Sequence, residues 1–105
     1  MPDFPNPFSG MTPERKMTPS ELLRALRLAL AAEQEAVHLY MAQADACDNE
    51  LAAMVLRDIA DEERVHAGEF QRLINILAPD EEGFLAEGAE EVDEMAEELG
   101  GGGSA

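Results

Sequence analysis

If the chain is helical, its apolar residues form stripes along the helices, and three ionisable side chains interrupt these stripes. Glu33 lies three residues after Leu30 and four before Val37, within about 20° of the line that joins them on a helix. A second stripe consists of larger apolar residues, namely Leu56, Ile59, Phe70, Leu73 and Leu77, and Glu63 and His66 interrupt it between Ile59 and Phe70. At a spacing of three residues on one helix face, Glu63 and His66 point at a common spot. Carboxylates and an imidazole without a thiolate suit iron or manganese, with zinc as a frequent competitor.

These residues also lie at one height if the chain forms a helical hairpin. Around a turn at Asp48, Glu33 comes 15 residues before and Glu63 comes 15 residues after. At the rise of an α-helix, each carboxylate is roughly 22 Å from the turn. Burial of two carboxylates without a partner would cost several kcal/mol each, and a bound cation removes that cost. We therefore predict Glu33, Glu63 and His66 as metal ligands and catalytic residues.

Each residue taken alone has a simpler explanation. Glu33 at the edge of its stripe could reach water over the small side chains of Ala29 and Ala36. Glu63 could pair with Arg64, and a single histidine on an apolar face is more often a hydrogen-bonded core residue. The coincidence of all three at one height favours the metal hypothesis over these separate explanations.

The first element that must position these residues is a helix from Thr18 to about Ala46. Residues 1–17 contain four prolines, at positions 2, 5, 7 and 13, and are expected to form an irregular arm. Thr18 then suits an N-cap, Pro19 the first helical position and Glu21 the third position of a capping box. No helix breaker follows until a short polar turn, which consists of Asp45, Asp48 and Asn49 together with Cys47.

The second element is a helix that returns antiparallel to the first. Either Asp48 or Asn49 in the polar turn can cap its start. The helix is expected to run to Ala78, because Pro79 disfavours helical backbone at the residue before it. Two helices of nearly 30 residues with a tight connection predict an antiparallel hairpin over 18–78.

The last quarter of the chain is acidic. Residues 80–98 hold ten acidic side chains and no basic one, within a net charge of -16. In the segment 79–99, helical spacing of apolar residues predicts a short third helix over roughly 88–99. The Gly-rich end, 100–105, has the composition of a flexible linker. We expect an all-α chain with a two-helix hairpin and a short C-terminal helix.

Composition excludes several classes of partner. The negative charge argues against nucleic acid and anionic membranes, and it suits cations. One cysteine, Cys47, cannot form an intrachain disulfide, which fits a reducing cytoplasm. The longest apolar run, 28–32, is too short to span a bilayer, and we expect no secretion signal. A hairpin of this size buries little surface alone, so self-association is expected.

At the candidate ligands the chain resembles the encapsulated ferritins, two-helix ferritin-like proteins stored inside encapsulin shells. The resemblance covers roughly residues 20–78. It rests on two blocks, Glu-Gln-Glu-Ala-Val-His-Leu-Tyr at 33–40 and Asp-Glu-Glu-Arg-Val-His-Ala at 61–67. In di-iron carboxylate bundles, two helices each give a Glu and two others each give a Glu-x-x-His. One hairpin of this chain offers half of that set.

The resemblance implies a ferroxidase, which oxidises Fe(II) with O₂ at a di-iron centre between two subunits. It assigns two irons to each subunit pair and the ligand role to the three candidate residues already named. Tyr40 matches a tyrosine close to the metals. Glu35 and Glu62 are candidate acids for iron uptake, although Ala32 and Leu39 replace an uptake acid and an aromatic found in some members.

The resemblance also implies how the chain assembles. Two hairpins would dimerise into a ferritin-like four-helix bundle, and the family builds a ring-shaped decamer of five such dimers. Members carry a C-terminal peptide that docks on the encapsulin shell protein, so the implied location is a nanocompartment in the cytoplasm. No clear hydrophobic peptide of that kind is visible here, and the end resembles a linker. Shell docking and iron storage are therefore expected from resemblance alone.

Two other functions stay open on the sequence. A rubrerythrin-like peroxidase on the same bundle would consume H₂O₂ in preference to O₂, although the chain lacks the Cys-x-x-Cys pairs of a rubredoxin domain. A non-catalytic helical oligomer or cargo adaptor would use Glu63 and His66 for structural hydrogen bonds. Metal analysis separates the enzyme from the adaptor, because only the enzyme requires iron.

Overall fold

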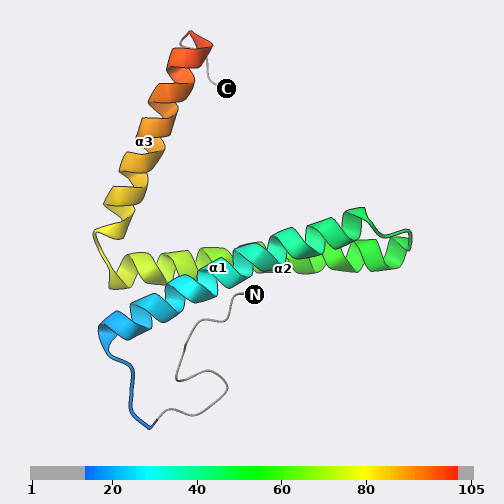
Figure 1. Ribbon diagram of the computed structural model, residues 1–105, viewed down its shortest axis with the longest axis horizontal. Helices are drawn as coiled ribbons and strands as arrows, with labels where there is room; N and C mark the ends of the chain where they lie inside the picture. Colours follow the sequence, from blue (N-terminus) through cyan, green and yellow to red (C-terminus); the bar gives the residue numbers. More distant parts are fainter. Residues whose placement is uncertain (1–13, 102–105) are drawn as a thin grey trace.

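The computed structural model describes residues 14–101, which form three helices. Helices α1 (Pro19–Asp45) and α2 (Glu50–Leu77) run antiparallel and lie side by side, while α3 (Glu81–Gly100) leaves the end of the hairpin opposite the turn (Figure 1). The all-α prediction and the hairpin are confirmed. Most of the predicted arm 1–17 and tail 100–105 lies outside the described residues. Within residues 14–101, no helix has the length and apolar character needed to cross a bilayer.

Helix α1 starts with the predicted capping box. The backbone N–H of Glu21 donates to Thr18 Oγ1 over 3.1 Å, and the backbone N–H of Thr18 donates to Glu21 Oε1 over 2.9 Å. Arg15 adds two further bonds to the same carboxylate, at 2.7 and 2.9 Å. The Glu21 carboxylate therefore stabilises the first turn of α1 by bonding both to Arg15 and to the backbone of Thr18.

Acid should weaken this helix start. The Arg15 guanidinium and the Thr18 N–H lower the pKa of Glu21 from 4.5 to about 2. A carboxylate whose pKa is depressed in the folded state contributes stability above its ordinary pKa, and that stability is lost between about pH 4.5 and 2 as the pH falls. In a carboxyl-carbon NMR titration, Glu21 should titrate near pH 2, and Arg15→Gln should move its midpoint upward. An unchanged midpoint in Arg15→Gln would show that the ion pair does not set this pKa.

Helix α2 starts and stops where local chemistry dictates. The side-chain oxygen of Asn49 accepts a hydrogen bond from the backbone N–H of Ala52 over 2.9 Å, so Asn49, not Asp48, is the N-cap. At the other end, α2 stops at Leu77, and the N–H of Ala78 bonds to the Ile74 carbonyl over 2.8 Å. Pro79 then prevents continuation, as predicted.

The contact between α1 and α2 uses smaller residues than the sequence analysis indicates. Ala53, Ala60, Ala67 and Ile74 recur every seventh residue along α2, and all four are buried or half-buried. We call these four residues the alanine seam. The larger side chains predicted for the same stripe lie beside the seam, and Leu73 remains 40% exposed. Small residues at a helix contact allow the two backbones to approach closely, which turns the larger neighbours outward.

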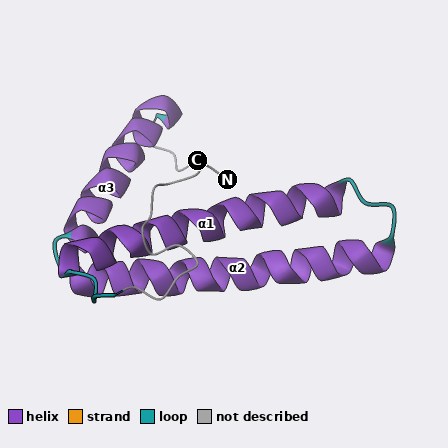
Figure 2. Cartoon of the chain, turned by 60° about the horizontal axis from the view of Figure 1, so that its bottom comes forward, coloured by secondary structure: helices purple, strands orange, loops and turns teal. Residues whose placement is uncertain are grey.

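Helix α3 is longer than predicted. It begins at Glu81, directly after the 78–80 connection, and not near residue 88. Glycines at 83 and 88 weaken the helical pattern in the sequence, but they do not stop the helix, and acids in its first turn complement the helix dipole. Gly101, at φ 62°, ends the helix in a left-handed conformation that favours glycine. No residue of α3 is buried, and the helix points away from the hairpin (Figure 2).

Candidate metal centre

Glu33, Glu63 and His66 meet near the middle of the hairpin. Glu33 comes from α1, and Glu63 and His66 come from α2. One ligand atom from each of the three residues lies within 4.8 Å of the other two. The ring atom Nδ1 of His66 is 3.7 Å from Oε2 of Glu33 and 3.7 Å from Oε2 of Glu63. The structure thus brings together the three residues that the helix heights placed at one level.

The chemistry of the group fits a cation. Oε2 of Glu33 is buried without a hydrogen-bond partner, and among residues 14–101 it is the one buried side-chain nitrogen or oxygen in that state. The 3.7 Å separation from His66 is too long for a hydrogen bond. A buried acceptor without a partner is unfavourable, and a metal ion coordinated by both carboxylates and the imidazole would satisfy it.

The alanine seam explains why two carboxylates on different helices can meet. Ala60, which is fully buried, lies one turn before Glu63 on α2, and half-buried Ala67 lies one turn after it. With no bulky side chain at these contacts, α1 and α2 approach closely at the level of Glu33. The carboxylates then reach across a short gap instead of extending into water.

The group sits at the side of the hairpin and not in a closed interior. The side chains of Glu33 and Glu63 are 21% and 20% exposed, and that of His66 is 47% exposed. All three candidate ligands therefore remain open to solvent on one side in the single chain. Such an opening leaves room for further ligands from a second molecule, which a three-residue carboxylate–histidine set requires to complete a di-iron site.

The other predicted site residues are not part of the group. Tyr40 is half-buried on α1, two turns after Glu33. Glu35 and Glu62 are exposed and do not belong to the three-residue group. Their suggested roles in iron uptake, and that of Tyr40 beside the metals, stay predictions.

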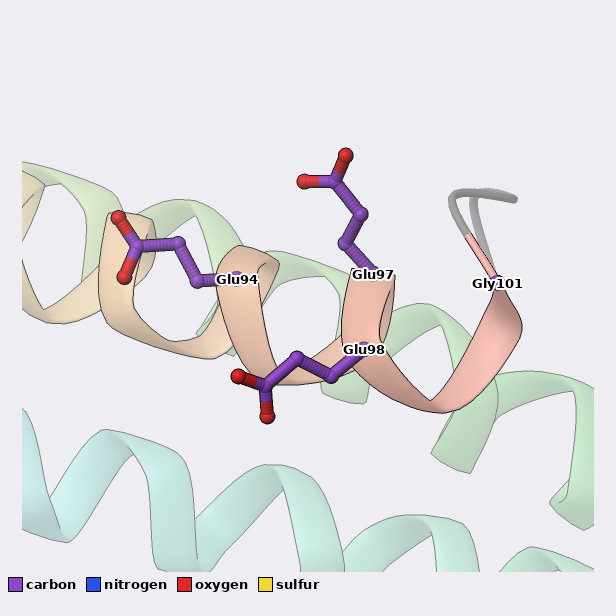
Figure 3. Close-up of a pocket in the computed structure, with 4 residues that line it drawn as sticks. All are labelled: Glu94, Glu97, Glu98 and Gly101. Carbon is purple, nitrogen blue, oxygen red and sulfur yellow. The ribbon is translucent and has the colours of Figure 1, made fainter.

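A hollow near the end of α3 does not resemble a metal centre. It is lined by Glu94, Glu97, Glu98 and Gly101. The three carboxylates point in different directions along the helix surface, and no imidazole or basic group joins them (Figure 3). Exposed acids at helical spacing are usually solvated, so this hollow adds no candidate site.

Comparison with known proteins agrees with the fold. The rubrerythrin family matches residues 24–100. The encapsulin nanocompartment cargo protein EncC of Myxococcus xanthus is 46% identical over 85 residues, which cover 81% of this chain and 65% of EncC. A ferritin-like–encapsulin shell fusion protein of Pyrococcus furiosus is 39% identical over 82 residues, covering 78% of this chain and 24% of the fusion.

A solved structure shows the same architecture. The crystal structure of the encapsulated ferritin domain from Pyrococcus furiosus superimposes with a TM-score of 0.75 at 35% identity, and covers 95% of this chain and 96% of that one. The helical hairpin, the family match and this structural likeness define a ferritin-like protein. Within that class, the chain belongs to the encapsulated ferritins. It spans less than two thirds of EncC and about a quarter of the fusion protein.

Proposed function

We propose that this protein is a ferroxidase that oxidises Fe(II) to Fe(III) with O₂ at a di-iron centre formed between two copies of the chain. The observation that carries the proposal is the meeting of Glu33, Glu63 and His66, with an oxygen of Glu33 buried and unpartnered. Membership of the encapsulated ferritins supports it.

The centre requires two copies because one hairpin supplies only half of the ligands. A di-iron carboxylate bundle takes a Glu from each of two helices and a Glu-x-x-His from each of two others. In this chain α1 supplies Glu33, and α2 supplies Glu63 and His66. A second hairpin against the open side would complete the four-helix bundle, with two irons per pair. A ring-shaped decamer built from such pairs follows from the family resemblance.

The residues present account for the direction of the reaction. Anionic carboxylate oxygens are hard ligands, so Glu33 and Glu63 favour Fe(III) over Fe(II). His66 must be neutral to offer a ring lone pair, and any proton it carries leaves on binding. Two Fe(II) substrate ions release one electron each to O₂, and with two protons these electrons yield H₂O₂. These protons come from water, which reaches the group on its exposed side beside His66.

We further propose that the oxidised iron is stored inside an encapsulin shell in the cytoplasm. A dimer or small ring cannot enclose a mineral, so storage requires a separate container. One relative is named as an encapsulin cargo protein, and the other carries the shell protein in the same chain. The acidic surface of this chain, with a net charge of -16, suits Fe(II) better than nucleic acid or an anionic membrane as a partner.

Anaerobic Fe(II) loading separates the enzyme from a non-catalytic adaptor. We expect about one iron per subunit, that is about two per pair. We also expect iron to promote association of the subunits, so that the oligomer contains more copies of the chain after loading. Plasma mass spectrometry and native mass spectrometry measure the two quantities. An adaptor in which Glu63 and His66 make structural hydrogen bonds would bind no iron and would not change its mass.

The match to the rubrerythrin family makes a peroxidase the second candidate. Such an enzyme would oxidise its iron faster with H₂O₂ than with O₂. The chain contains Cys47 alone and so lacks the paired cysteines of a rubredoxin electron donor. Stopped-flow oxidation of the Fe(II)-loaded protein with equal concentrations of the two oxidants decides between the candidates. A ferroxidase should react faster with O₂.

A further inference from the structure

Within the single chain, helix α3 has no buried apolar residue that would fix its direction. None of its residues is buried, and its large apolar side chains are exposed, from 47% at Leu85 to 92% at Leu99. Only the three-residue connection 78–80 joins it to α2. In Figures 1 and 2 it projects from the open end of the hairpin, with its length clear of both long helices. Hydrophobic packing therefore does not determine its orientation.

Two arginines from different helices bind the first turn of α3. Arg27 on α1 donates from Nη1 to Oε2 of Glu81 over 2.9 Å and from Nη2 to Oε1 over 3.0 Å. Arg72 on α2 donates from Nη1 to Oε1 of Glu82 over 2.6 Å. Arg27 and Glu81 are 54 residues apart in the chain, so no local sequence rule predicts their contact.

The two ion pairs restrain the position of α3 to different degrees. The fork of Arg27 engages both carboxylate oxygens of Glu81, which restrains direction as well as distance. The Glu81 side chain is only 18% exposed, and the Arg27 guanidinium lowers the pKa of that carboxyl. The pair between Arg72 and Glu82 is exposed on both sides and has a single bond, so it is the weaker one.

We propose that these two ion pairs, from Arg27 to Glu81 and from Arg72 to Glu82, form an ionic clamp that sets the orientation of α3 relative to the hairpin. Two attachment points on different helices restrain the rotation that one flexible connection would permit. The nine acidic side chains of α3, with no basic one, would otherwise repel the acidic hairpin. Because the clamp consists of charge pairs at the surface, salt releases it. The clamp thereby sets the direction in which the exposed apolar side chains of α3 face relative to the hairpin.

Distances between spin labels test the clamp in the full chain. Cys47 is first changed to Ser, and labels are placed at the exposed positions Gln43→Cys on α1 and Glu94→Cys on α3. Dilution with unlabelled protein isolates distances within one chain if the protein associates. Double electron–electron resonance then gives the width of the distance distribution.

The variant that removes the clamp is Arg27→Gln/Arg72→Gln. At about 50 mM salt its distribution should be at least about twofold wider than in the parent, and about 1 M salt should widen the parent to the same extent. The matched control is Arg57→Gln/Arg64→Gln, which removes two exposed ion pairs within the hairpin and should leave the width unchanged. The charge exchange Arg27→Glu/Glu81→Arg should keep the parent width.

Two results would overturn the proposal. One is an unchanged width when both arginines are lost, because α3 would then be oriented by its connection alone. The other is a wider distribution together with a loss of circular dichroism at 222 nm that corresponds to α3. In that case the arginines stabilise the helix itself and not its direction.

Discussion

Replacement of Glu33 by alanine is expected to lower the rate of aerobic Fe(II) oxidation by about 100-fold or more. In the proposed centre Glu33 is the single ligand from α1, so its loss would leave both metal positions of a pair without a carboxylate from that helix. Iron bound per subunit should fall with the rate. The measurement is the appearance of Fe(III) absorbance after mixing with air-saturated buffer, together with metal analysis of the loaded protein.

The same substitution should act in the opposite direction on stability. Oε2 of Glu33 is buried and unpartnered when no metal is bound, so its removal relieves an unfavourable group. We expect the metal-free Glu33→Ala protein to melt at the same temperature as the parent or higher. With that result, a loss of activity in Glu33→Ala could not be attributed to unfolding of the variant.

Glu69→Ala provides the matched control for charge. Glu69 is exposed on α2, one turn after His66, and is not part of the three-residue group. Its removal takes away one negative charge close to the site while all three ligands remain. Oxidation should stay within about twofold of the parent rate, since exposed charges are largely screened. Equal rates in the parent and in Glu33→Ala would disprove the assignment of this residue as a ligand.

Replacement of Ile74 by alanine is expected to have the largest effect on folding. Ile74 has no exposed surface and is the largest fully buried side chain among residues 14–101. It closes the alanine seam at the end of the hairpin from which α3 departs. Truncation of a buried isoleucine removes transfer free energy and leaves a cavity, so the free energy of unfolding should fall by about 2–5 kcal/mol. Urea unfolding of the metal-free protein, followed by circular dichroism, measures the loss.

Ile76→Ala tests whether this loss depends on the seam. It is the same substitution two residues further along α2, but Ile76 is 55% exposed. On the metal-free chain it should change the free energy of unfolding by no more than about 0.5–1 kcal/mol. If both variants lose equal stability, Ile74 does not have the special position that its burial indicates.

The site could be predicted from the sequence because helices convert residue number into position. A rise of 1.5 Å per residue and a turn at 46–49 fix the level of Glu33 and Glu63, and a spacing of three places His66 beside Glu63. The ends of α1 and α2 could be predicted to within one residue, since Thr18, Asn49 and Pro79 act on the backbone next to them, although Asp48 stayed an alternative to Asn49 as the cap. These features depend on local geometry alone.

The features that could not be predicted depend on how separate elements dock. Periodicity defines an apolar stripe, but the stripe on α2 is wider than α1 can cover, and packing decides which part is buried. The structure buries Ala60 and Ile74 and leaves Leu73 partly exposed. In the same way, the start of α3 depends on competition between glycines and favourable acids. The contact of Arg27 with Glu81 joins two helices across 54 residues of sequence, so no local pattern indicates it.

Ala60 gives the hairpin the properties of a spacer of fixed thickness. Ala60 has no exposed surface and lies one turn before Glu63, and the distance between packed helix axes depends on the side chains at their contact. The span between the opposing carboxylates is thus set by a residue that has no ligand atom of its own. A wider spacer would suit a larger ion, and a change in metal preference could arise without any change in the ligands.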